Sequence, residues 1–438
     1  MTRIARRKLL TRRNAIGAGG MAAILATGRG PALAQEQNVH WLRWTDFVPA
    51  SDVILKGQFT QDCKKATGIN LKVETVNAND LQARITSAIQ SGAGADIIMA
   101  FSNWPQLYAE SVADAADVAE EIGKAQGGYY DVSKQVATVG SKWIGVPWTC
   151  GGGLMSVRKS WFQEVGYDTF PDTLDKLRDA GKKLKVKGRP LGQTAGHTFG
   201  DAPGWWYPFL WSFGGKEVEA DGKTVVLNSK ETVESIKFAV AMWKETMDEG
   251  GLAWDDTNNN RAFLSGTISA TNNGASIYIE AKKKPETYLT EKGTPMWQDI
   301  VHADIPKGPV AGPFNLPGTF TDMLMGYSKN LPAAKDFLRW AHSKEAFDPW
   351  FTSQQGYSCG ATKMWETHKV WQADPVLAPF HDLPAKGRLV GYAGPPNRKA
   401  AEVVSKYIVV DMYAKAIQGM PAEEAAKWAH GEAAKVYV

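Results

Sequence analysis

Three short segments of the sequence combine aromatic side chains with Asp or Asn, and this combination can bind a small polar molecule. The segments are 44–47, 101–105 and 201–207. Aromatic rings stack on the C–H faces of sugars, whereas carboxylate and amide groups hydrogen-bond to their hydroxyls. We expect all three segments to be turns, where binding residues are common on a rigid scaffold. The candidate binding residues from these segments are Trp44, Asp46, Phe101, Asn103, Trp104, Asp201, Trp205 and Trp206.

The same side chains leave a second ligand class open. Aromatic rings beside a carboxylate can also form a cage for an ammonium group, because the face of the ring attracts a cation. Asp46 and Asp201 would then supply the counter-charge. A cationic or zwitterionic solute, of the betaine or polyamine type, is therefore an alternative to a sugar.

The sequence contains none of the usual catalytic or metal-binding patterns. The glycine runs 127–128 and 151–153 lack the spacing of a phosphate-binding loop or a dinucleotide fingerprint. The adjacent carboxylates at 255–256 and 423–424 point apart on a helix, so we expect solvated surface at both. Three cysteines, Cys63, Cys150 and Cys359, fit no zinc pattern, and the histidines are scattered. We predict no cofactor, no metal and no enzymatic activity.

The N-terminus has the features of an export signal. Residues 1–34 carry seven basic and no acidic side chains, a Gly/Ala-rich stretch at 15–26, and Ala32-Leu33-Ala34, which predicts cleavage after Ala34. The pair Arg12-Arg13 is similar to a twin-arginine (Tat) signal, and a long Sec signal is the alternative. The sequence therefore predicts a periplasmic protein.

The charge of the remaining chain argues against a nucleic-acid partner. The whole chain has 50 Lys and Arg against 46 Asp and Glu, but seven of the basic residues lie before residue 35. The rest has 43 basic and 46 acidic side chains, so it offers no net positive charge to neutralise phosphates.

The spacing of apolar residues predicts alternating strands and helices. Strands are expected at 39–44, 69–76 and 95–100, and helices at 52–66 and 81–89. Gly68 and Gly92 would end the two helices, and Asn79 or Asp80 would begin the second one. This order predicts an α/β protein with a mostly parallel sheet, in which ligands gather at the carboxyl ends of the strands.

Several motifs, in a fixed order, resemble those of the family 1 extracellular solute-binding proteins, which include the maltose-binding proteins. Five of them are Ala95-Asp96-Ile97-Ile98, Trp143-Ile144-Gly145-Val146-Pro147, Leu227-Asn228-Ser229, Ala262-Phe263-Leu264-Ser265-Gly266 and Ser328-Lys329-Asn330. The resemblance extends over nearly the whole mature chain. It implies a two-lobe periplasmic-binding-protein fold of type II, in which discontinuous lobes are joined by a multi-strand hinge and ligand lies in the cleft between them.

The resemblance also implies domain boundaries and a function. The expected parts are a signal peptide at 1–34, the first lobe at 35–147, the second lobe at 148–317, a hinge return with more of the first lobe at 318–375, and C-terminal helices of the second lobe or hinge at 376–438. The expected function is capture of a small solute, in the first place a sugar or sugar derivative, for an ABC importer. The protein would act as a monomer and deliver the solute to the membrane permease. A secreted carbohydrate hydrolase is the remaining alternative.

By position in the family, three further residues become candidates for ligand contact. Asn273 follows the Ala262–Gly266 motif, Phe320 lies in the hinge-side loop, and Trp148 follows the segment that enters the second lobe, where it could instead pack at the hinge. Members of the family often have Trp at the position of Ser276, so the resemblance implies one stacking platform fewer here.

Overall fold

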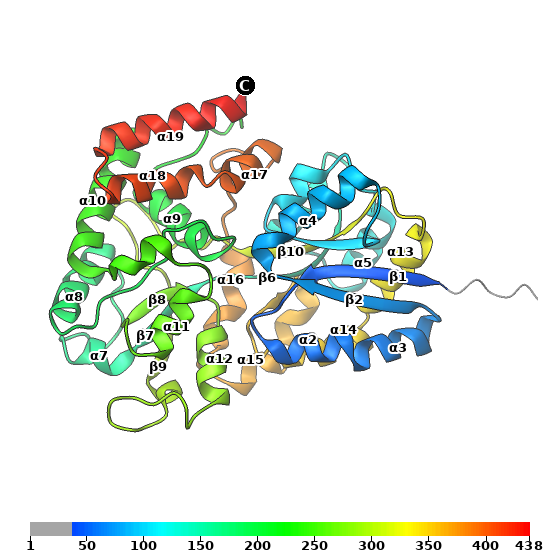
Figure 1. Cartoon of the computed structure of the whole chain (residues 1–438), viewed down its shortest axis with the longest axis horizontal. Helices are drawn as coiled ribbons and strands as arrows, with labels where there is room; N and C mark the ends of the chain where they lie inside the picture. Colours follow the sequence, from blue (N-terminus) through cyan, green and yellow to red (C-terminus); the bar gives the residue numbers. More distant parts are fainter. Residues whose placement is uncertain (1–36) are drawn as a thin grey trace, which may run out of the picture. The chain divides into compact units, whose positions relative to one another are not determined.

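The computed structural model describes residues 37–438, in which two of the three sheets carry their own helices (Figure 1). The third sheet pairs only β4 (Thr138–Val139) with β5 (Lys142–Trp143). The strands of the larger sheet are, in spatial order, β11 (Cys359–Gly360), β6 (Val146–Gly151), β10 (Gly318–Leu324), β3 (Ile97–Phe101), β1 (Asn38–Trp44) and β2 (Asn70–Val76). β1 pairs in parallel with both β2 and β3, as the sequence predicted, whereas β10 runs antiparallel to β3 and β6. We call this sheet and its helices the first lobe.

The first-lobe elements show how closely local signals set their ends. Gly68, in the left-handed conformation with φ 77°, ends a helix where the sequence predicted it. The single helix predicted at 52–66 is wrong, because Gly57 interrupts it. The cap of the next helix is Asn77, whose side chain accepts a hydrogen bond from the backbone of Asn79. The helices of the first lobe are α2 (Pro49–Lys56), α3 (Gln58–Thr67), α4 (Ala78–Ser91), η1 (Trp104–Tyr108, 3₁₀), α5 (Ala116–Ala125), α6 (Asp131–Val136), α13 (Leu331–Ala341) and α14 (Lys344–Ser353).

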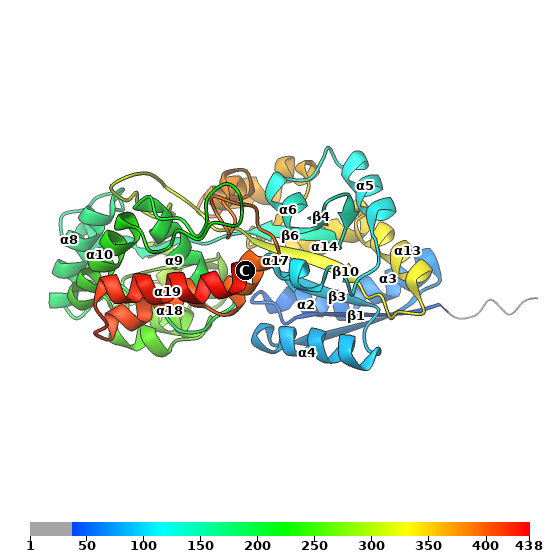
Figure 2. The same cartoon turned by 90° about the horizontal axis from the view of Figure 1, so that it is seen from above.

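The second lobe is built on a smaller antiparallel sheet, in the order β8 (Ala270–Asn273), β7 (Leu154–Arg158) and β9 (Ile300–Ala303). Figure 2 shows the C-terminal helices lying beside the long helix α10 of this lobe, although they are distant from it in sequence. The helices of the second lobe are α7 (Lys159–Gln163), α8 (Leu174–Val186), α9 (Asp201–Ser212), α10 (Lys230–Thr246), α11 (Asn258–Leu264), α12 (Ser276–Lys283), α17 (Arg398–Ser405), α18 (Ile408–Ile417) and α19 (Ala422–Tyr437).

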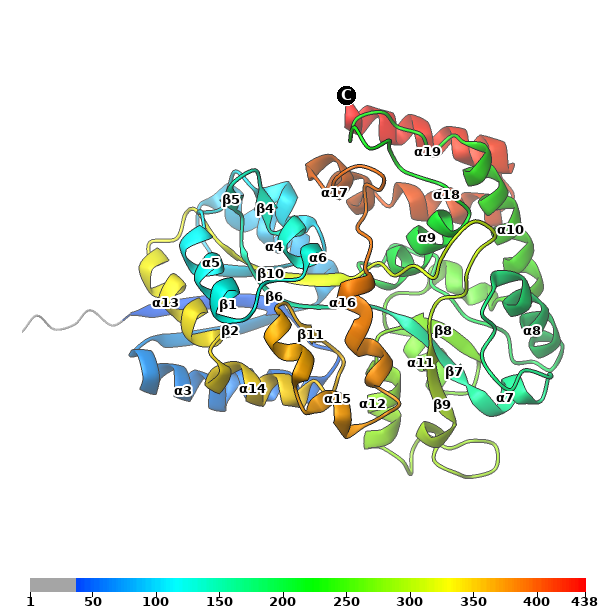
Figure 3. The same cartoon turned by 180° about the vertical axis from the view of Figure 1, so that it is seen from behind.

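Three chain segments connect the lobes within the compact unit Asn38–Val438. The first is Gly151–Gly153, between β6 and β7, so β6 extends beyond the boundary predicted at 147/148. The second is Asn315–Pro317, which leads back into β10. The third follows α15 (Val370–Ala373) and α16 (Leu383–Lys386) and leads through Gly387–Val390 toward α17 (Figure 3).

The predicted signal peptide, its Tat-like motif and its cleavage site lie outside the described residues. Within residues 37–438, no helix combines the length and the apolar character needed to cross a membrane. The hydrophobic side chains instead form separate cores, a large one in each lobe.

The three thiols are buried and free, which gives a testable expectation. Burial raises the pKa of all three, that of Cys150 to about 12, so little reactive thiolate exists at pH 8. We expect the native protein to be nearly inert to Ellman's reagent and the denatured protein to expose three thiols. Cys150 and Cys359 are register partners on β6 and β11. A count of one thiol after denaturation would therefore contradict the expectation and indicate a bond between these two.

Candidate functional site

A cavity of about 100 Å³ lies where the two lobes and their connections meet. All three connecting segments line it, through Gly151–Gly153, Leu316–Pro317 and Leu389–Val390. The backbone approaches the wall so closely that a Cβ on Gly153 would lie 1.9 Å from Oδ1 of Asn272, so a larger residue there would have to displace the Asn272 side chain. Because pockets for drug-sized ligands measure about 300–1,000 Å³, the cavity in this conformation fits only a small solute.

Aromatic side chains from both lobes form much of the wall. Trp44 and Phe320 stack with their ring centres 4.9 Å apart, at the ends of β1 and the start of β10. Phe199, which precedes α9 in the second lobe, packs 5.0 Å from Phe101 and 5.9 Å from Trp44 of the first lobe. The aromatic lining residues are Trp44, Phe47, Phe101, Trp104, Phe199, Phe320 and Tyr357.

The lobes also touch beside the cavity. Gln82 on α4 donates a hydrogen bond to Ser405 on α17, with 3.1 Å between Nε2 and Oγ. Helix α17 packs against η1, which carries Trp104. Together with Phe199, these contacts join the second lobe to the first beside the cavity.

Asn103 is the most conspicuous polar group of the cavity wall. It is only 1% exposed, and neither its Nδ2 nor its Oδ1 has a hydrogen-bond partner in the described protein. Leaving a buried amide unpaired costs about 1–3 kcal/mol, so a water molecule or a ligand is expected to bind it. The residue lies between β3 and η1, at the carboxyl end of a parallel strand, where α/β sheets bind ligands.

Two carboxylates face the same cavity from the second lobe. Asp256 is 3% exposed and accepts hydrogen bonds from the backbone N–H groups of Phe199, Gly200 and Asp201, at 3.1, 3.3 and 2.7 Å. It therefore caps the N-terminus of α9 from a distant part of the sequence. Burial raises the pKa of Asp256 to about 6 despite these bonds. Burial, and then the charge of Asp256, raises the pKa of Asp201 well above its usual value.

Asn273 and Ser276 belong to a chain of side-chain hydrogen bonds. Asn273 donates to Oδ1 of Asn260, and Asn260 donates to Oγ of Ser276 at 3.0 Å. Ser276, where the family often has Trp, is buried at the start of α12. Its hydroxyl thus holds a cavity-lining asparagine in position through Asn260, and a Trp side chain could not make that contact.

The structure brings seven of the eleven predicted binding residues to the cavity. Those that line it are Trp44, Phe101, Asn103, Trp104, Asp201, Asn273 and Phe320. Those that lie elsewhere are Asp46, Trp148, Trp205 and Trp206.

Asp46 and Trp148 make contacts within the first lobe instead. Asp46 accepts a hydrogen bond from Gln354 at 2.9 Å and lies 3.7 Å from Nη2 of Arg43. Trp148 packs in the first-lobe core, with its ring centre 5.4 Å from that of Trp41, so its alternative role in packing matches the structure.

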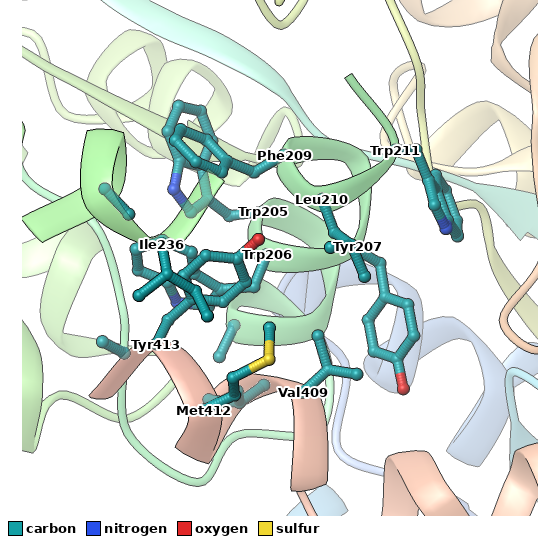
Figure 4. Packing of buried hydrophobic residues seen from close by; sticks show 14 of the residues in the cluster. Trp205, Trp206, Tyr207, Phe209, Leu210, Trp211, Ile236, Val409, Met412 and Tyr413 are labelled. Atoms are coloured by element: carbon teal, nitrogen blue, oxygen red, sulfur yellow. The ribbon is translucent and has the colours of Figure 1, made fainter. Parts of the chain in front are cut away.

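The turn predicted at 201–207 is wrong, because Asp201–Ser212 forms helix α9. This helix is apolar on nearly all sides and therefore buried, and Figure 4 shows Trp205 and Trp206 packed among core side chains such as Tyr413. The loop setting that suggested ligand contact does not exist for these two residues.

Sequence reasoning missed several lining residues, among them Phe199, Tyr357 and Asp256. The expectation of solvated surface at 255–256 holds for the exposed Asp255 and is wrong for Asp256. No local signal marks Asp256, because its partners lie more than 50 residues away in the sequence. Phe199 lies two residues before the predicted 201–207 segment, so a wider window would have included it.

This architecture, two α/β lobes around a solute-sized cavity, is that of the periplasmic binding proteins. Residues 48–346 match the family of bacterial extracellular solute-binding proteins, and the chain belongs to that family. The resemblance inferred from the motifs is thereby confirmed. Proteins of this family bind solutes for ABC transporters and do not convert them, so the hydrolase alternative is set aside.

Three similar proteins illustrate the match. A probable ABC transporter-binding protein of Deinococcus radiodurans is 22% identical over 349 residues, 75% of this chain and 79% of that protein. A maltose-bound protein of T. maritima superposes with a TM-score of 0.75 and 18% identity, covering 90% of this chain and 98% of that one. A ribitol complex from Agrobacterium radiobacter K84 gives 0.71 and 20%, covering 91% and 98%. At these identities the structures establish the fold alone.

Proposed function

We propose that the protein captures a small hydroxylated solute, a sugar or sugar derivative, in the periplasm as a monomer and delivers it to a membrane permease. The unpaired amide of Asn103, beside the aromatic side chains of the wall, carries the proposal, because it offers a donor and an acceptor to vicinal hydroxyls. The maltose and ribitol complexes among the similar structures support the same ligand class.

Capture would work by closure of the lobes. Trp44, Trp104 and Phe320 of the first lobe would contact the apolar face of the solute, while Phe199 and Asp201 reach it from the second lobe. A solute that contacts both lobes binds the closed form more tightly than the open one, and so shifts the equilibrium toward closure. The closed form is then the one that a permease can distinguish.

A thermal-shift panel of monosaccharides, polyols and their derivatives tests the proposal. A solute that binds only the folded protein stabilises it by about 2.7 kcal/mol at 100 times its Kd. We expect one solute class to raise Tm, and Asn103→Ala to weaken its binding roughly tenfold to a hundredfold, because two hydrogen bonds are lost.

Asn228→Ala is the matched control, since Asn228 is exposed and lies outside the cavity. It should leave both Tm and the solute-induced shift unchanged. A shift that survives Asn103→Ala in full would contradict binding at this cavity.

A further inference from the structure

The described ionisable side chains that line the cavity include acidic residues and no basic ones. Among the described residues that line it, Asp201 and Asp256 are acidic and none is Lys, Arg or His. The nearby Tyr357 is affected by these carboxyl groups. Burial, and then the negative charges of Asp46, Asp201 and Asp256, raises the pKa of its hydroxyl. A neutral sugar would bring no positive charge to the carboxyl groups of Asp201 and Asp256.

The carboxylate of Asp256 is already stabilised by the protein itself. Asp256 accepts three backbone N–H bonds at the start of α9, where the helix dipole places partial positive charge. At the start of α9 the N–H of Asp201 thus donates to Asp256 and that of Ala202 to Oγ1 of Thr198, so neither group is free for a ligand.

Asp201 has no such compensation. Its Oδ2 accepts one hydrogen bond, from Nδ2 of Asn259 at 2.7 Å, and no ion pair involves its carboxylate among the described residues. The charges that act on it come from Asp256 and then Asp255, both negative. A carboxyl group in such surroundings takes up a proton unless a cation enters the cavity and stabilises its ionised form.

We propose that the solute carries a protonated amine, which binds against the carboxylate of Asp201 while Asn103 takes a neutral polar group of the same molecule. This rests on the proposed function and narrows its ligand class to amino sugars, amino polyols or other small alkylammonium compounds. The aromatic wall accommodates such a group, since ring faces attract cations and contribute about 0.5–2 kcal/mol. Asn103 is the independent sign of a ligand, because its buried amide lines the cavity without a partner.

Binding of matched pairs of solutes, measured by titration calorimetry at pH 7, tests this inference. The pairs are glucosamine with glucose, galactosamine with galactose, and 1-amino-1-deoxysorbitol with sorbitol. Choline and putrescine show whether an ammonium group without a sugar or polyol body is sufficient. We expect the amine of a pair to bind at least about tenfold more tightly than its neutral partner, and Asp201→Asn to abolish that preference.

Asp255→Asn is the matched control, because Asp255 is exposed, does not line the cavity and affects Asp201 less than Asp256 does. It makes the same change of charge and should leave the preference intact. Asp201→Asn keeps an oxygen that can accept from Asn259, so we also expect the solute-free variant to melt at the same temperature as the wild type or higher.

Two results would overturn the inference and leave the proposed function standing. One is a neutral sugar or polyol that binds at least as tightly as its amine, with Asp201→Asn unchanged in affinity. The other is a solute-free Asp201→Asn that melts several degrees lower, which would make Asp201 a structural residue. If neither amines nor neutral partners bind, the result contradicts the proposed function itself and this inference with it.

Discussion

Trp206→Ala is expected to destabilise the protein by about 3–5 kcal/mol, among the largest effects of any single substitution in the described chain. Trp206 is 1% exposed and stacks on Tyr413 with 4.5 Å between ring centres. Its Nε1 donates to the backbone oxygen of Thr194 at 3.1 Å. Truncation would leave a large cavity where α9 and α18 meet and an unpaired carbonyl oxygen.

Urea unfolding followed by circular dichroism measures this loss, with Trp428→Ala as the control. Trp428 is only partly buried, on α19 under the side chain of Lys415, so its loss should cost much less. The solute should still raise the Tm of the Trp206 variant, starting from the lowered value of the variant. A stable Trp206→Ala protein that no longer binds solute would instead assign Trp206 to the binding site.

Arg43→Met is expected to cost about 3–5 kcal/mol as well, for an electrostatic reason. Arg43 is 1% exposed, lies 4.9 Å above the ring of Trp41, and is 3.7 Å from Asp46. Its charge also acts on the buried Asp322, whose pKa burial raises to about 7. Without the guanidinium group, both carboxylates would lie in the first-lobe core with no cation beside them.

The pH dependence of this loss separates charge from packing. The substitution should raise the folded-state pKa of Asp46 and Asp322 further. The free energy that these two buried groups cost the folded state then grows as pH rises above the usual pKa of Asp, and it is smaller at pH values where both groups are protonated. Urea unfolding at pH 5 and pH 8 should therefore give a smaller loss at pH 5. Arg84→Met, which removes an exposed arginine 2.7 Å from Glu74, should cost less than about 1 kcal/mol at either pH. An equal loss at both pH values for Arg43→Met would mean that packing alone explains it.

Much of the first lobe could be predicted from local patterns. The strands expected at 39–44 and 69–76 match β1 and β2 within a residue, because alternating apolar residues and the glycine after each helix are local signals. The cavity-lining residues Trp44, Asn103 and Trp104 were predicted from segments that combine aromatic side chains with Asp or Asn. These segments follow β1 and β3, at the carboxyl ends of parallel strands, where ligands gather.

The second-lobe part of the site was harder to predict because it depends on contacts between distant segments. The aromatic residues after Asp201 have the composition of a sugar-binding loop. They nevertheless form a helix that is buried on nearly all sides, because it packs against α10 and α18. Asp256 resembles a surface residue in the sequence, and its role as a cap depends on where α9 begins. Which distant segments pack together depends on the tertiary structure, and the spacing of apolar residues within one segment does not predict it.

Equilibrium dialysis against the solute found in the thermal-shift panel, followed by mass spectrometry of the recovered solute, tests the central claim most directly. The claim is that one cavity between the lobes holds a small solute reversibly and without chemical change. We expect one solute molecule per chain, recovered with its mass unchanged, and little retention by Asn103→Ala. A changed mass would show turnover, and retention by Asn103→Ala equal to that of the wild type would place binding elsewhere; either result would contradict the claim.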